Sequence, residues 1–112
     1  MNIINLTPHV LNVVANSGKT IEILPSGKVA RCTQTNTVWD NNILVDGTDE
    51  FLTINNTTFG QVVDLPEPEE GTLFVVSSIV KSAVPNRNDV LRPGEAVRDA
   101  AGKIIGCKGL AL

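Results

Sequence analysis

This chain has 112 residues, 42% of them hydrophobic, two cysteines and a net charge of −3. The length suits a single domain with one modest core, no apolar run approaches the roughly 18 residues of a membrane span, and two cysteines are too few for a disulfide-stapled secreted module. The amino terminus shows no basic leader before an apolar segment, so we expect one cytoplasmic domain over residues 1–112 with no membrane partner.

The charge is divided along the chain. Residues 1–70 hold nine carboxylates and three cations, whereas residues 71–112 hold six cations and three carboxylates. Three of the four arginines lie between Arg87 and Arg98, and a guanidinium group suits phosphate oxygens and stacks on bases. A local cationic patch on an acidic protein favours a compact anionic ligand and argues against a DNA or RNA polymer as partner.

The first third has the turn chemistry of a β-meander. Asn16 and Gly18 favour a hairpin turn because both residue types accept positive φ. A short apolar segment at 1–6 comes first. Strands are expected at 9–15 and 20–24 on either side of this turn, and a third at 28–34 after a second turn at residues 25–27.

The middle of the chain is less regular. Residues 35–56 contain two short apolar pieces around an Asp-Gly turn, which indicates an inserted or variable hairpin, or a partly ordered excursion from the sheet. A strand is expected at 59–65, followed by an acidic, proline-stiffened surface connector at 66–71. Trp39 and Phe59 are expected in the core; if exposed near arginines, either ring would be a platform on which a base stacks.

The last third contains the most hydrophobic strand, residues 72–77, whose unbroken apolar run is typical of a central strand buried on both faces. A short helix is expected to begin after Ser77 or Ser78, which can cap it, and to end before Pro85. A polar loop at 86–94 and strands at 95–99 and 104–110 complete the chain.

These elements predict a mainly β fold: an antiparallel sheet of Greek-key type or a small barrel, decorated with one or two short helices, with an α+β arrangement as the alternative. Residues suited to catalysis are few. His9 is the only histidine, and the chain has no nucleophile-elbow sequence, no glycine-rich phosphate loop and no cluster with metal-ligand spacing. We therefore expect neither enzyme activity nor a metal or cofactor.

The loop at 86–94 is the strongest candidate for ligand binding, because loops display polar side chains and this one carries two arginines. Arg87 and Arg92 would neutralise phosphates, while Asn86, Asn88 and Asp89 would contact ribose hydroxyls or base edges. The alternative is that Arg87 and Asp89 pair with each other and fix the loop.

Five further residues complete the candidate site. Arg98 would add a third guanidinium, unless it pairs with the neighbouring aspartate in a turn. Ser77 and Ser78 would offer hydroxyl groups where a strand meets a helix, although capping explains them equally well. Arg31 and His9 would close the site from the amino-terminal sheet, the alternative for His9 being a structural imidazole beside a proline turn.

Short motifs along the chain resemble a family of small proteins encoded by phages and prophages. They begin with Asn5-Leu6-Thr7-Pro8-His9 and continue through Leu65-Pro66, Gly71-Thr72, Arg87-Asn88-Asp89, Pro93-Gly94 and Val97-Arg98-Asp99. The resemblance covers nearly the whole chain outside residues 35–56 and implies a phage context. In that context, a small arginine-bearing β domain is similar in kind to phage sponge proteins, which sequester the nucleotide signals of bacterial immunity.

We therefore expect a phage-encoded, non-catalytic homo-oligomer of the host bacterial cytoplasm. It would bind and sequester a phosphorylated, cyclic nucleotide immune signal, such as a cyclic ADP-ribose isomer, and so inhibit anti-phage defence. The pocket would be shared between protomers, because a domain this small rarely encloses such a ligand alone. The alternative is a phage protein-interaction module that inhibits a host protein directly, docking by a sheet edge or by its acidic face.

Overall fold

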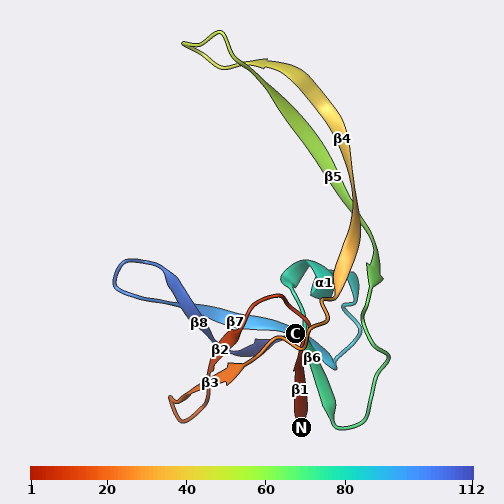
Figure 1. Cartoon of the computed structure of the whole chain (residues 1–112), viewed down its shortest axis with the longest axis vertical. Coiled ribbons are helices and arrows are strands. Elements are labelled where there is room, and N and C mark those ends of the chain that lie inside the picture. The colour runs from red at the N-terminus through yellow and green to blue at the C-terminus, as the bar shows by residue number, and fades with distance from the viewer.

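The computed structural model describes residues 1–112 as eight strands and one helix (Figure 1). In chain order these are β1 (Asn2–Asn5), β2 (Leu11–Val14), β3 (Thr20–Ile23), β4 (Arg31–Leu44), β5 (Phe51–Val63), β6 (Thr72–Val75), α1 (Ser78–Ala83), β7 (Val90–Arg98) and β8 (Ile104–Ala111). Six strands form a body, while β4 and β5 form a long arm that projects from it. The prediction of a mainly β fold with a short helix is confirmed. The helix is neither long nor apolar enough to span a membrane.

The six strands of the body form a nearly closed, barrel-like sheet in the order β1-β6-β7-β8-β2-β3. The strand β6 runs parallel to both of its neighbours, and β8 runs parallel to β2. Only β7–β8 and β2–β3 are antiparallel hairpins within the body. The sheet is therefore mixed, a pattern that the hairpin signals of the sequence do not reveal.

The two edges of the sheet meet at Asn5, which forms a bridge with Pro25 and whose carbonyl accepts a 3.0 Å hydrogen bond from the Ser26 N–H. The Asn5 side chain is 1% exposed. Its amide donates to the carbonyls of His9 (2.7 Å) and Ile23 (3.1 Å), and its Oδ1 accepts from the backbone N–H (2.9 Å) and the hydroxyl (2.7 Å) of Thr7. One buried amide thus uses all four of its hydrogen bonds to join β1, β3 and the turn between β1 and β2.

The core lies between β6 and α1. As predicted, the strand β6 is buried, and Phe74, Val75 and Val76 are each at most 1% exposed. Ser77 caps the helix, its hydroxyl accepting a 3.3 Å hydrogen bond from the Val80 N–H. This confirms the predicted short helix. The core cluster consists of Leu6, Ala30, Phe74, Val76, Val80 and Val90.

Three predicted element bounds are wrong. The strand expected at 28–34 begins at Arg31 and continues as β4 to Leu44, and the strand expected at 59–65 is the end of β5, which begins at Phe51. The two strands pair from Arg31↔Val63 to Leu44↔Phe51, so residues 35–56 are the outer part of one long hairpin. Near the other end of the chain, β7 begins at Val90, so residues 90–94 of the loop expected at 86–94 belong to a strand.

The core positions predicted for Trp39 and Phe59 are also wrong, because both residues belong to the arm and are 70% and 51% exposed. The arm leaves the body after its first few residues (Figure 1), so its side chains have no second layer to pack against. The longest dimension of the molecule reaches 55 Å as a result.

Gly94 lies where the backbones of β7 and β8 approach closely. A Cβ atom there would overlap the carbonyl oxygen of Lys108 and lie 2.9 Å from that of Gly109. We expect Gly94→Ala to lower the free energy of unfolding by about 1–3 kcal/mol, because the two strands must move apart. Urea denaturation measures this. Ala96→Ser, at an exposed position of the same strand, is the control, and equal stability of the two variants would contradict the prediction.

Candidate functional site

Two neighbouring parallel strands, β1 and β6, end beside the first residues of β7. In the register of the sheet, Asn5 at the end of β1 pairs with Val75 at the end of β6, and Val75 pairs with Leu91 of β7. The residues that follow these pairs, including Ser77 and Arg92, therefore gather at one place although they are far apart in the sequence.

A groove with a volume of about 610 Å³ opens at this edge. Four of the predicted site residues line it: His9 after β1, Ser77 and Ser78 after β6, and Arg92 on β7. The remaining lining residues are small or apolar: Thr7, Pro8, Leu11, Pro93, Gly94, Ala96, Ile104, Gly106 and Cys107. The volume lies within the range of small-molecule sites, roughly 300–1,000 Å³.

The lining of the groove carries a positive charge. It contains one guanidinium and no carboxylate. Arg92 is half-buried, and both ion pairs of the molecule, Arg31–Asp64 and Arg87–Asp89, lie elsewhere. A guanidinium with no protein counter-ion, facing a groove beside serine hydroxyls, has its donors free for an anion.

Thr7 is a lining residue that the sequence reasoning did not select. Its position between Asn5 and His9 in the amino-terminal motif was the only signal that could have pointed to it. The Thr7 hydroxyl is engaged by Asn5 Oδ1, so Thr7 shapes the groove and holds the segment that carries His9.

The loop residues before Arg92 have a different role. Arg87 donates from Nε and Nη2 to the two carboxylate oxygens of Asp89, at 3.1 and 2.6 Å, and from Nη1 to the carbonyl of Pro66 at 2.9 Å. The buried Lys81 donates to the Arg87 carbonyl at 2.8 Å. Arg87 and Asp89 therefore pair with each other and fix the loop, the alternative considered above. Asn86 and Asn88 are exposed beside them and do not line the groove.

This pairing makes the stability pH-dependent. The hydrogen bonds that Asp89 accepts from Arg87, together with the positive charge of Arg87, hold the pKa of Asp89 below its ordinary value. A depressed folded-state pKa stabilises the fold above the unfolded pKa of about 3.9, and the contribution is lost as the pH falls through the lower, folded value.

We therefore expect wild type to be more stable than Asp89→Asn at pH 7, with the difference shrinking below about pH 4. Urea denaturation at several pH values measures it. Asp46→Asn, at an exposed turn position, should show no such trend. A difference between wild type and Asp89→Asn that stays constant from neutral to acid pH would contradict the account.

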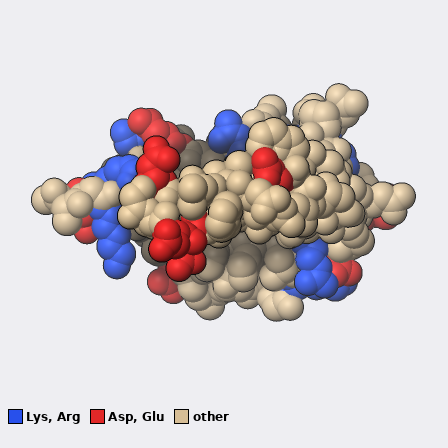
Figure 2. Space-filling view, turned by 90° about the horizontal axis from the view of Figure 1, so that it is seen from above, with Lys and Arg blue, Asp and Glu red and all other residues tan.

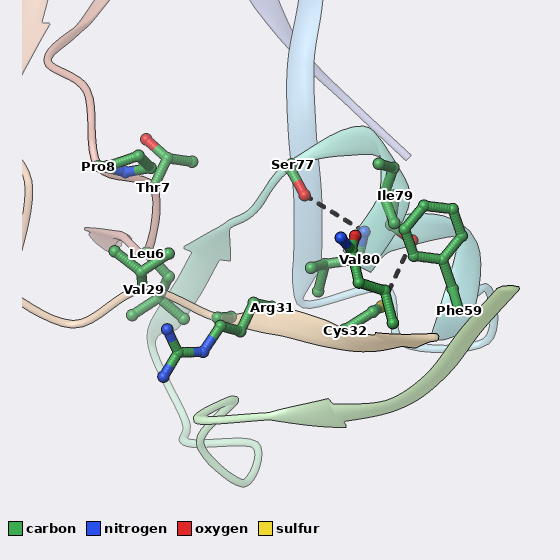
Figure 3. Close-up of a pocket in the computed structure, with 12 residues that line it drawn as sticks. Leu6, Thr7, Pro8, Val29, Arg31, Cys32, Phe59, Ser77, Ile79 and Val80 are labelled. Atoms are coloured by element: carbon green, nitrogen blue, oxygen red, sulfur yellow. Dashed lines mark hydrogen bonds between the residues drawn. The ribbon is translucent and has the colours of Figure 1, made fainter. Parts of the chain in front are cut away.

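Arg98 and Arg31 lie outside the groove. Arg98 donates to the carbonyl of Gly102 at 2.8 Å, within the turn between β7 and β8. Arg31 lies 4.0 Å from Asp64 and lines a second pocket of about 240 Å³ at the base of the arm. Figure 3 shows its guanidinium at one end of this pocket and the ring of Phe59 near Ile79 at the other.

The two pockets are neighbours, because Thr7, Pro8 and Ser77 line both of them. The exposed ring of Phe59 lines the same pocket as Arg31, at the end opposite the guanidinium (Figure 3). No group of three or more His, Cys, Asp or Glu side chains gathers in the fold. The two cysteines, Cys32 and Cys107, are free.

No protein-family model matches this chain, and no curated protein or solved structure shows a significant match.

Proposed function

We propose that this chain is a phage-encoded, non-catalytic protein of the host bacterial cytoplasm that binds and sequesters a phosphorylated, cyclic nucleotide immune signal. The observation that carries the proposal is the convergence of His9, Ser77, Ser78 and Arg92 on one groove. Arg92 would hold the phosphate, the serine hydroxyls would donate to its oxygens, and His9 would contact the ribose or a second phosphate. The phage context comes from the motifs that begin with Asn5 and end with Asp99.

Binding without turnover fits the composition of this groove. Its lining offers hydrogen-bond donors and one imidazole, and it contains no carboxylate to act as a general base or as the second member of an acid–base pair. The absence of carboxylates also spares a bound phosphate from like-charge repulsion.

The affinity required of a sponge favours an oligomer. Nanomolar binding is worth about −12 kcal/mol, whereas each charge-assisted hydrogen bond contributes roughly 1.5–3 kcal/mol before the cost of ordering is subtracted. One guanidinium and two hydroxyls fall short of that value. Stacking on Phe59 in the adjacent pocket and donors from a second subunit would supply the remainder.

A thermal-shift screen tests the proposal. We expect cyclic ADP-ribose or a cyclic dinucleotide to raise the melting temperature of the protein, while uncharged adenosine does not. Chromatography of the recovered ligand should show it intact. If no phosphorylated nucleotide raises the melting temperature, or if the ligand is recovered as a cleaved product, the proposal is wrong.

A second candidate function is that of a protein-interaction module that inhibits a host protein. The arm favours it, since residues 32–60 carry four carboxylates, no cation and all three exposed Trp and Phe side chains. A protein of this kind would give no thermal shift with any nucleotide, so the same screen separates the two candidates.

A further inference from the structure

We propose that the arm tip of each subunit binds the β7–β8 hairpin of a second copy of this chain. The inference is independent of the nucleotide proposal. It concerns the arm and the outer end of the β7–β8 hairpin, which both extend away from the core (Figure 1) and expose large apolar side chains.

The arm has an apolar surface with nothing over it. A two-stranded ribbon is marginally stable by itself, and the outer edge of each of its strands is unpaired. Leu44 and Phe51 are cross-strand partners beside the turn at the tip and therefore share one face of the ribbon. Seven large apolar residues of the arm are exposed: Val38, Trp39, Leu44, Phe51, Leu52, Ile54 and Phe59.

Beyond Arg31 at its base, the arm is also acidic. Residues 32–60 contain Asp40, Asp46, Asp49 and Glu50 and no lysine or arginine. Three of these carboxylates surround the turn at the tip. Two arms laid against each other would bring like charges together, so a cationic surface is the better partner for the tip.

The β7–β8 hairpin offers such a surface. Ile104 and Ile105, at the start of β8, are 56% and 51% exposed. Residues 90–111 hold four cations, Arg92, Arg98, Lys103 and Lys108, against two carboxylates, Glu95 and Asp99. The carboxylate of Asp99 already accepts hydrogen bonds from the N–H groups of Ala101 and Lys103 in the turn.

The figures place the two surfaces apart in one molecule. In Figure 1 the arm rises from the body while the hairpin projects to the side. Figure 2, seen from above, shows several lysine and arginine side chains toward the left, the side on which Figure 1 shows the hairpin, with acidic side chains among them. The tip of the arm therefore reaches a hairpin only on another molecule.

A second copy of the chain matches both surfaces at once. An unrelated protein bound to the arm would leave Ile104 and Ile105 of the cationic hairpin uncovered. In a dimer with a twofold axis, the arm tip of each chain would lie on the hairpin of the other. Each of these two contacts would bury both apolar patches and pair the acidic tip with the basic hairpin. No tip or hairpin would then remain free to bind a third chain. Ile104 also lines the groove with Arg92, so the partner's arm tip would lie beside that groove.

A charge-swap experiment tests the exchange. The tip variant is Asp49→Lys with Glu50→Lys, and the hairpin variant is Arg98→Glu with Lys103→Glu; all four side chains are exposed. The control, Glu67→Lys with Glu69→Lys, reverses two charges on the exposed connector. Light scattering after size exclusion gives the mass of each species relative to the 11.9 kDa chain, and circular dichroism confirms that each variant is folded.

We expect wild type and the control to show a multi-chain mass, and each charge-reversed variant alone to show the mass of one chain. Mixing the tip and hairpin variants should restore the assembly, because the reversed tip meets the reversed hairpin and the two unreversed surfaces also meet. A wild type that is monomeric, charge-reversed variants that assemble as well as wild type, or a mixture that remains monomeric would each overturn the proposal.

Discussion

Replacing Asn5 by alanine is expected to lower the free energy of unfolding by about 3–5 kcal/mol, because four hydrogen bonds end on this one buried amide. The change removes the Asn5 partner of the Ile23 carbonyl and of the Thr7 N–H, and it leaves the His9 carbonyl with only the Thr7 hydroxyl at 3.2 Å as donor. Those groups lie where the two edges of the sheet meet, so the cost includes loosening of the closure as well as the lost bonds.

Urea denaturation of Asn5→Ala and Asn2→Ala measures this effect. Asn2 lies on the same strand and is exposed, so its replacement should change the stability by less than about 1 kcal/mol. Asn5→Asp provides a second comparison: it keeps the acceptor for Thr7 but places a carboxylate oxygen against two carbonyls, and it should also be strongly destabilising. A cost below about 1 kcal/mol for Asn5→Ala would show that the closure does not depend on this side chain.

Replacing Arg92 by glutamate is expected to weaken nucleotide binding at least about 100-fold. The reason is that the change removes two charge-assisted hydrogen bonds, each worth roughly 1.5 kcal/mol. The introduced carboxylate would also repel the phosphate. Stability should change little, because Arg92 has no ion-pair partner in the protein. Titration calorimetry with cyclic ADP-ribose, or with whichever cyclic nucleotide the screen identifies, measures the dissociation constant.

The matched control for Arg92 is Lys19→Glu, which makes the same change of charge at an exposed position in the turn between β2 and β3. It should leave the dissociation constant within a few-fold of wild type. If both variants weaken binding equally, the effect is one of net charge, and the specific role assigned to Arg92 is wrong.

Features that depend on local chemistry could be predicted from the sequence. The Asn-Ser-Gly turn after β2 and the Asp-Gly turn in the arm both have glycine at positive φ, at Gly18 and Gly47. The helix begins after the capping Ser77, and the apolar run that ends at Val76 is buried in the core. Each of these follows from a few neighbouring residues whose preferences agree.

Features that depend on distant pairing could not be predicted. Nothing local indicates that β6 runs parallel to β1 and β7, yet this arrangement alone brings His9, Ser77 and Arg92 together. The same limit explains the arm. Its Thr- and Asn-rich middle carries no strong alternation of apolar and polar residues, so the hairpin expected within residues 35–56 could not be extended to the strands expected at 28–34 and 59–65.

For Arg87, spacing alone allowed either a ligand contact or a pair with Asp89. The structure shows the pair, together with a hydrogen bond to the Pro66 carbonyl. Of the arginines clustered in the sequence, only Arg92 faces the groove.

Native mass spectrometry tests the central proposal most directly. Wild type and Arg92→Glu would each be incubated with cyclic ADP-ribose and a cyclic dinucleotide, freed of excess ligand and measured without denaturation. The account predicts that wild type retains one of these nucleotides at its intact mass and that Arg92→Glu appears without it. Wild type carrying no nucleotide, or both proteins retaining the same one equally, would contradict it.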